Sequence, residues 1–202
     1  MIEKIGNSFE KRAAHYDNPL TAYIGKGELR VIRSLVPPGS SVLDYGCGTG
    51  RSALDHARRG CNVTAYDLSP NMLSLAENKA KQIGVNIEFT STVHQLIDRK
   101  WPVVTCIGVF DYYPDPKPLL HELNHYMEKT GRLVVTWPNA LSPFGWLYFV
   151  FSRFTTPSTP RTPMFIRRAA KDVGLQISSL LYAFPSWSPF GHTLVVTMRR
   201  SL

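Results

Sequence analysis

The sequence is poor in cysteine, and its few thiols form no recognisable pattern. Cys47, Cys61 and Cys106 are the three cysteines, and all fall within apolar runs. Neither their number nor their spacing suits a disulfide framework or a zinc site. We therefore expect buried free thiols, a reducing compartment and no bound metal.

The amino terminus lacks the apolar core of a secretory signal. Charged residues recur throughout "MIEKIGNSFEKRAAHYD", whereas a signal peptide needs an uncharged run. The longest nearly uncharged stretch, residues 133–152, is interrupted by Pro138, Pro143 and Gly145, which disfavours a membrane-spanning helix. The expectation is a cytoplasmic protein, with peripheral contact at a membrane left open.

Acidic residues are almost missing from the last third of the chain. Residues 131–202 contain eight arginines and lysines but one acid, Asp172, in a chain whose net charge is +8. This imbalance favours an anionic partner, which leaves a substrate phosphate or carboxylate, an acidic membrane surface and nucleic acid open. A solvated basic face is the alternative.

Short apolar runs alternate with helical patterns along the chain. Strands are expected at residues 41–46, 61–67, 86–91, 102–110, 132–137, 175–184 and 192–200, and helices at 52–60, 69–84, 116–131 and 164–174. This alternation predicts an α/β fold with a mostly parallel sheet that helices cover on both faces. We expect one domain over residues 1–202, with an N-terminal helical cap at 1–38 and a proline- and aromatic-rich lid or insertion at 138–162.

A glycine-rich segment, "VLDYGCGTG", ends the first expected strand, and Asp67 ends the second. Glycines there let backbone amides approach a ligand closely, and an acid at the end of the second strand suits a ribose diol. A phosphate-binding loop is excluded because Arg51 and Ser52 follow Gly50. Asp44 would repel a pyrophosphate and suits a cationic ligand instead.

These segments, "VLDYGCGTG" and "VTAYDLSPNML", resemble the first two signatures of the class I S-adenosylmethionine-dependent methyltransferases. The opening "SFEKRAAHYD" and residues 108–139 are similar to quinone-type and related small-molecule members. The resemblance implies a Rossmann-like methyltransferase fold, which is a doubly wound, mostly parallel seven-stranded sheet with an antiparallel last strand. It also implies S-adenosyl-L-methionine as the cofactor.

The resemblance further implies a set of cofactor contacts. The loop would hold the methionine end of the cofactor, Asp67 its ribose and Leu68 its adenine. The residues implied are Tyr16, Asp44, Gly46, Cys47, Gly48, Gly50, Asp67, Leu68 and Thr92. Many relatives carry an aspartate after the third strand, whereas this chain has "STV" there, so Thr92 or backbone groups are expected at the adenine.

Three residues are candidates for the acceptor side. Asp111 and Tyr112 follow the fourth expected strand, between cofactor and acceptor, and His192 begins the last strand, whose start lies at the ligand edge if it runs antiparallel. The run "FDYYPDP" lacks the Asn/Asp-Pro-Pro-Tyr/Phe pattern of relatives that methylate amide or adenine nitrogens. Nucleic acid is therefore a disfavoured partner.

Aromatic residues between Phe144 and Phe154, with Trp187 and Phe190, predict either a lid packed on its own domain or an apolar acceptor channel that also suits a membrane interface. The favoured function is methylation of a hydrophobic small molecule, anionic or membrane-associated acceptors included. A nucleic-acid or protein methyltransferase that uses the basic third is one alternative, and a non-catalytic cofactor-binding protein is another. The acceptor atom and the oligomeric state stay open.

Overall fold

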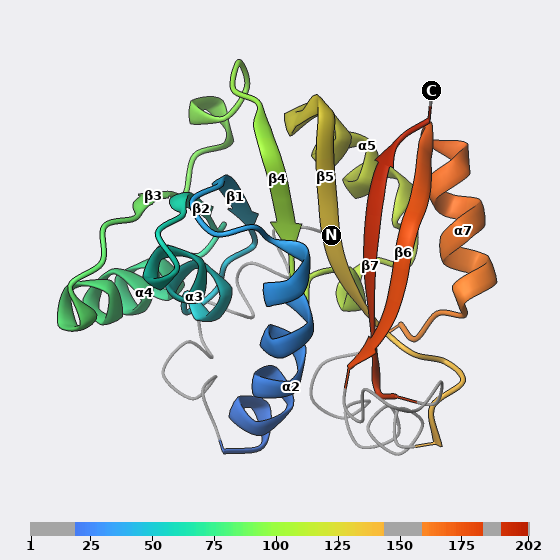
Figure 1. Ribbon diagram of the computed structural model, residues 1–202, viewed down its shortest axis with the longest axis horizontal. Coiled ribbons are helices and arrows are strands. Elements are labelled where there is room, and N and C mark those ends of the chain that lie inside the picture. Colours follow the sequence, from blue (N-terminus) through green and yellow to red (C-terminus); the bar gives the residue numbers. More distant parts are fainter. Residues whose placement is uncertain (1–18, 144–158, 184–190, 202) are drawn as a thin grey trace.

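The computed structural model describes residues 19–143, 159–183 and 191–201, which form a seven-stranded sheet in the order β3-β2-β1-β4-β5-β7-β6. The strands are β1 (Ser41–Tyr45), β2 (Asn62–Tyr66), β3 (Glu88–Thr90), β4 (Trp101–Cys106), β5 (Met127–Pro138), β6 (Leu175–Ala183) and β7 (Thr193–Arg200). β1 to β5 pair in parallel, and β7 is antiparallel to both of its neighbours (Figure 1). The predicted α/β fold, with its antiparallel last strand, is confirmed.

Helices cover both faces of this sheet (Figure 1). The longer ones are α2 (Pro19–Leu35), α3 (Arg51–Arg58), α4 (Pro70–Ile83), α5 (Lys117–Tyr126) and α7 (Pro163–Asp172), and two 3-10 turns are η2 (Val93–Gln95) and η3 (Phe110–Tyr112). Ile32 of α2, Ala53 of α3 and Leu73 of α4 belong to one buried cluster. Leu120 of α5 and Ile166 of α7 belong to a second. The sheet is therefore the middle of three layers.

Helix α4 shows how local sequence sets the ends of an element. The Ser69 hydroxyl accepts a hydrogen bond from the Met72 amide, and Pro70 occupies the first turn, where its missing N–H costs nothing. Gly84 ends the helix in the left-handed conformation, at φ 68°. The expected helix at 69–84 is thus confirmed to within a residue at each end.

The expected helix at 116–131 is wrong in its last five residues. Helix α5 ends at Tyr126, and Met127 already pairs with Trp101 as the first residue of β5. Val103 pairs with Arg132, so the chain between Met127 and Arg132 forms a bulge. A Cβ at the buried Gly131 would lie 2.8 Å from Cγ of Met127, which shows how tightly the bulge is folded.

The carboxyl ends of the parallel strands lead into the loops that carry the candidate site. Tyr45 at the end of β1 is in register with Tyr66 of β2, which is in register with Thr90 of β3. Thr193, the first residue of β7, pairs with Pro138, the last of β5. The start of β7 therefore lies at the same edge (Figure 1).

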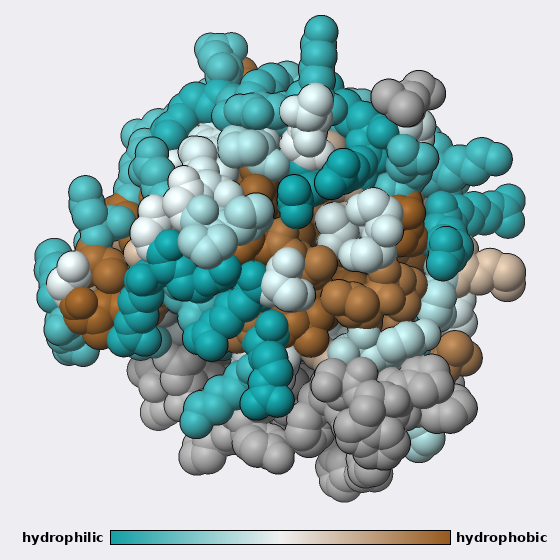
Figure 2. Space-filling view, viewed as in Figure 1, coloured by the Kyte–Doolittle hydropathy of each residue, from teal (hydrophilic) through white to brown (hydrophobic). Residues whose placement is uncertain are grey.

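The apolar run at 133–152 begins inside β5, as its first part predicts. No helix in the described part of the chain is long and apolar enough to cross a membrane. In the view of Figure 2, apolar surface gathers in the middle of the face, between hydrophilic residues.

Candidate functional site

The glycine loop joins β1 to α3 at the carboxyl edge of the sheet. The Gly46 and Cys47 amides donate to the carbonyl of Tyr66, at 2.7 and 2.9 Å, which ties the loop to the end of β2. Gly46 has φ 73°, and a Cβ there would lie 2.5 Å from Cγ2 of Val109. No described atom lies within 4 Å of a Cβ built at Gly48. Among the described residues, the loop backbone is thus closely packed at Gly46 and uncovered at Gly48.

Asp67 follows β2 and links this loop to the next one. Its Oδ2 accepts a hydrogen bond from the Gly48 amide at 2.7 Å, and its Oδ1 accepts one from the Ser69 amide at 2.9 Å. The half-buried Asp67 lies beside Gly48, and the roles of these two residues at the ribose and methionine ends of S-adenosylmethionine stay predictions.

Asp44 lies beneath the loop and is only 1% exposed. Its two carboxylate oxygens accept hydrogen bonds from the Ser52 and Thr105 hydroxyls, at 2.6 and 2.7 Å. Burial, with the charges of Asp44 and Asp67, raises the pKa of the Cys47 thiol, which stays protonated. Asp44 anchors the loop from inside, and its direct contact with a cofactor stays a prediction.

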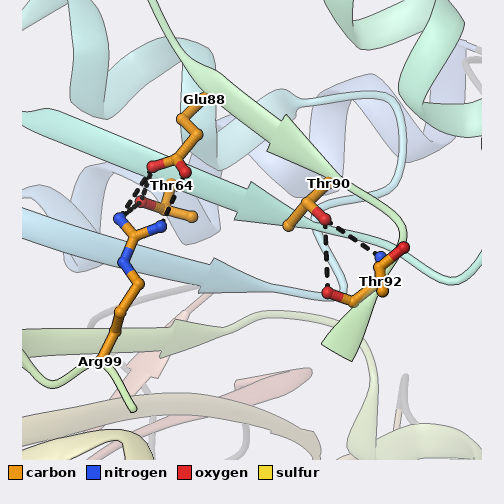
Figure 3. A network of polar contacts seen from close by, with 5 residues as sticks. All are labelled: Thr64, Glu88, Thr90, Thr92 and Arg99. Carbon is orange, nitrogen blue, oxygen red and sulfur yellow. Dashed lines mark hydrogen bonds and ion pairs between the residues drawn. The ribbon is translucent and has the colours of Figure 1, made fainter. Parts of the chain in front are cut away.

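The loop after β3 is closed by threonines rather than by an aspartate (Figure 3). The Thr90 hydroxyl accepts a hydrogen bond from the Thr92 amide at 3.0 Å and donates one to the Thr92 carbonyl at 3.4 Å. Thr92 is exposed, as is Leu68, at 43%. The roles of Thr92 and Leu68 at an adenine stay predictions.

Glu88 supplies the acid of β3, but at the opposite end of the strand. Arg99 donates to both of its carboxylate oxygens, at 2.7 and 2.8 Å, and Thr64 donates at 2.9 Å (Figure 3). The hydrogen bond from Arg99 lowers the pKa of Glu88. This carboxylate belongs to a surface ion pair and does not replace the missing adenine-side aspartate.

Asp111 and Tyr112 lie in η3, which follows β4 at the ligand edge. Loss of water around the Asp111 carboxyl, followed by the charge of Glu28, raises the pKa of Asp111 to about 7. The Asp111 carbonyl accepts hydrogen bonds from the amide and the hydroxyl of Thr159, at 2.8 and 2.9 Å. Tyr112 is half-buried beside it. Asp111 is thus a carboxyl group that titrates near neutral pH.

His192 precedes β7 and lies at the same edge as the glycine loop. Its Nδ1 is 3.1 Å from the Thr193 hydroxyl, and its carbonyl accepts a hydrogen bond from the Asn139 amide at 2.8 Å. Burial lowers the pKa of His192, against the opposing charge of Glu28. The imidazole is therefore mainly neutral at physiological pH, as a proton acceptor must be.

Glu28, Arg51 and Thr193 complete the site and were missed by the sequence patterns. The Glu28 carboxylate, on α2, accepts hydrogen bonds from Arg51 at 2.7 Å and from the Thr193 hydroxyl at 3.0 Å. Arg51 directly follows Gly50, so its position could have been noticed. Glu28 gave no signal, because it lies among many charges in an expected cap.

Some predictions fall on residues that the structure does not describe. Tyr16, the aromatic residues between Phe144 and Phe154, Trp187 and Phe190 lie outside the described residues. The two ends of the expected insertion at 138–162 are described and pair with each other: the Arg161 amide donates to Pro138, and the Ala140 amide donates to Arg161. The division into cap, domain and lid stays a prediction.

Within the described ranges, no group of three or more histidine, cysteine, aspartate or glutamate residues could hold a metal ion.

Comparison with known proteins gives the family context. Residues 42–131 match the model of a family described as a methyltransferase domain. The chain is 32% identical over 127 residues to the ubiquinone biosynthesis O-methyltransferase of Erwinia tasmaniensis. This aligned region covers 61% of this chain and 52% of that protein. For the protein of the same name from Xanthomonas axonopodis pv. citri, the identity is 29% over 166 residues, or 73% of this chain and 69% of that protein. This chain thus spans about half the length of the first of these relatives.

Solved structures show the same fold. Magnesium protoporphyrin IX methyltransferase from Synechocystis, with bound SAH, superposes with a TM-score of 0.74 at 21% identity, over 98% of this chain and 95% of that one. The glycine loop and Asp67 stand at the edge of a sheet with this strand order, and the family match spans both. By the match of residues 42–131 and by its fold, the chain is similar to the class I S-adenosylmethionine-dependent methyltransferases.

Proposed function

We propose that this protein transfers a methyl group from S-adenosylmethionine to a hydroxyl oxygen of a hydrophobic small molecule. The observation that carries the proposal is the position of His192 and Asp111. Both stand at the sheet edge that also carries Gly48 and Asp67. The pKa of Asp111 is raised to about 7, whereas burial lowers the pKa of His192 and keeps its imidazole neutral and able to accept a proton. The names of the curated relatives, which are O-methyltransferases, support oxygen as the acceptor atom.

The residues divide the work between holding the cofactor and preparing the acceptor. The backbone at Gly48 and the Asp67 carboxylate would hold the cofactor. When bound, S-adenosylmethionine supplies an electrophilic methyl group whose bond to sulfur breaks with the electron pair left on sulfur. His192 takes the proton of the acceptor hydroxyl while the oxygen of that hydroxyl forms a bond to the methyl carbon. Alignment of the reacting groups supplies much of the rate enhancement, about 7–11 kcal/mol in favourable cases.

The acceptor is proposed to be apolar and to reach the site from a membrane surface. Support comes from the outer side of α7, where Met164 is 79% exposed and Phe165 is 37% exposed. Arg167, Arg168 and Lys171 are exposed on the same helix. An apolar tip next to cationic side chains suits an anionic interface. Peripheral membrane contact of an otherwise cytoplasmic protein is part of the proposal.

The test is methyl transfer from radiolabelled S-adenosylmethionine to 4-alkylcatechols of increasing chain length. We expect turnover to improve with chain length, and His192→Gln to lower kcat by roughly 10²–10⁴ while calorimetry shows unchanged affinity for the demethylated cofactor. Asp67→Ala should weaken that affinity at least tenfold, since a hydrogen bond to a charged group contributes about 1.5–3 kcal/mol. Exposed Glu77 on α4 offers the matched control, Glu77→Ala.

Three outcomes would overturn the proposal in different ways. Unchanged affinity in Asp67→Ala would remove the ribose assignment. Equal methylation of alkylbenzoic acids, unaffected by His192→Gln, would point to a carboxylate acceptor that needs no base. Tight cofactor binding without transfer to any phenol, RNA or protein offered would leave a non-catalytic binding protein.

A further inference from the structure

A chain of hydrogen bonds leads from His192 into the interior of the protein. His192 Nδ1 lies 3.1 Å from the Thr193 hydroxyl, which donates to Oε1 of Glu28 at 3.0 Å, and Oε2 of Glu28 accepts from Arg51 at 2.7 Å. Thr193 is 4% exposed and Glu28 is 8% exposed. These hydrogen bonds join β7, α2 and the start of α3. Their surroundings exclude most water, and hydrogen bonds are stronger in such surroundings.

The direction of each hydrogen bond follows from the groups involved. Glu28, ion-paired with Arg51, is a carboxylate and only accepts. The Thr193 hydroxyl has one proton, which it gives to Glu28. Its oxygen therefore acts as an acceptor toward His192, and the imidazole proton must be on Nδ1.

We propose that Thr193 and Glu28 are positioning residues that hold His192 in the Nδ1–H tautomer, so that Nε2 is the nitrogen that takes the proton of the acceptor. The tautomer itself is a property of the protein, whereas its catalytic meaning rests on the proposed methyl transfer. A carboxylate that acts on a histidine through a hydroxyl would do here what a directly bonded carboxylate does in other active sites.

Charged groups from several elements surround this series of hydrogen bonds. Glu28 on α2 favours the protonated form of His192, which would stabilise the imidazolium as it forms. Arg51 on α3 is paired with Glu28 and moderates its charge. Asp111 in η3 also faces Glu28, whose charge raises its pKa. Loss of the Glu28 charge should therefore lower the pKa of both His192 and Asp111.

Paired variants distinguish the effect of losing the Thr193 hydroxyl from a general effect on folding. Thr193→Val removes the hydroxyl at nearly constant volume, and Thr193→Ser restores it. Thr197→Val is the matched control, because Thr197 is also buried in β7 and its hydroxyl has no hydrogen-bond partner among the described residues. Glu28→Gln keeps the shape of the side chain and removes its charge.

The first readout is the nitrogen NMR spectrum of the 202-residue chain labelled at its six histidines, with His192 assigned by its loss in His192→Gln. We expect a protonated Nδ1 in the wild type, in Thr193→Ser and in Thr197→Val, and a mixture of tautomers in Thr193→Val and Glu28→Gln. A wild-type His192 protonated on Nε2, or a Thr193→Val spectrum identical to that of wild type, would overturn the inference.

Turnover of a 4-alkylcatechol gives the second readout. Thr193→Val should lower kcat about three- to tenfold with KM little changed, Thr193→Ser should recover it, and the acid limb of the Glu28→Gln pH profile should move to lower pH. A loss of kcat that Thr193→Ser does not recover would reduce Thr193 to a packing role. If the NMR result holds while no variant changes turnover, the tautomer is set as inferred and His192 is not the base, so the proposed function fails instead.

Discussion

Among single residues, the buried polar groups near the glycine loop differ in how the protein satisfies them. Asp44 and Glu28 each accept two hydrogen bonds. His56 on α3 is fully buried, and neither ring nitrogen has a hydrogen-bond partner in the described part of the chain. Burial lowers the pKa of His56, although Asp44 and Asp55 oppose this. The folded protein therefore keeps this imidazole neutral, which lowers the free energy of unfolding only at acidic pH.

We expect the lowered pKa of His56 to make the protein less stable as the pH falls below about 6.5, the ordinary pKa of histidine. The unfolded chain takes up a proton on this imidazole in that range, and the folded chain does not. His56→Leu removes this proton uptake. Between pH 7 and pH 5, the variant should lose about 1 kcal/mol less of its free energy of unfolding than wild type, as measured by urea denaturation.

The comparison with the variant is needed because another group acts in the opposite direction. The pKa of Asp111 is raised to about 7, so the folded state takes up a proton there on acidification and gains stability. Both proteins carry Asp111, and the difference between them isolates His56. His121→Leu, at an exposed position of α5, should behave like wild type. Parallel stability curves for wild type and His56→Leu would contradict the prediction.

At the level of whole elements, α2 contacts the first residue of α3 at Gly25. A Cβ at Gly25 would lie 2.1 Å from Nη1 of Arg51, so the guanidinium lies directly on the helix backbone. From there Arg51 reaches Glu28, one turn further along α2, at 2.7 Å. The contact couples α2 to the residue that follows the glycine loop.

Gly25→Ala should therefore lower stability, although alanine ordinarily favours a helix over glycine by about 1 kcal/mol. The methyl group displaces Arg51 and leaves the buried Glu28 carboxylate without its ion pair, at a cost of roughly 1–3 kcal/mol. Urea denaturation measures the change, and Ser74→Ala, at an exposed position of α4, is the control for helix propensity. If Gly25→Ala stabilises as much as Ser74→Ala, the contact with Arg51 does not matter.

Elements set by local signals were predicted well, and those set by distant contacts were not. Helix α4 carries its own start at Ser69 and its own end at Gly84, so its bounds could be predicted from the sequence. Helix α5 ends at Tyr126 without such a signal. Arg200, more than seventy residues later, donates to the carbonyls of Asn124 and Met127 at this end. No periodicity between residues 116 and 131 contains that information.

The candidate site divides in the same way. Gly46, Gly48 and Asp67 belong to contiguous motifs, and the structure brings them together through the hydrogen bond from Gly48 to Asp67. Glu28 reaches the site only because α2 packs against the start of β7, where Thr193 lies. A partner that is 165 residues away in sequence cannot be inferred from spacing.

For the molecule as a whole, the fold and the candidate site do not explain the positive charge on the surface. The basic third of the sequence places Arg167, Arg168 and Lys171 on the exposed side of α7. The one acid of that helix, Asp172, is paired with Lys117 at 3.0 Å. The exposed cations of α7 therefore keep a net positive field next to the apolar residues of its first turn.

We expect the positive charge of α7 to make the protein bind to anionic membranes. Each arginine near such a surface contributes about 1 kcal/mol, so Arg167→Glu with Arg168→Glu should weaken binding to phosphatidylglycerol vesicles at least tenfold. Wild type should sediment with these vesicles more than with phosphatidylcholine vesicles, and less so in high salt. Arg58→Glu with Lys81→Glu, at exposed positions of α3 and α4, changes the net charge equally and should bind like wild type. If both pairs weaken binding to the same extent, net charge alone is responsible. If lipid composition makes no difference, the basic face of α7 is only a solvated surface.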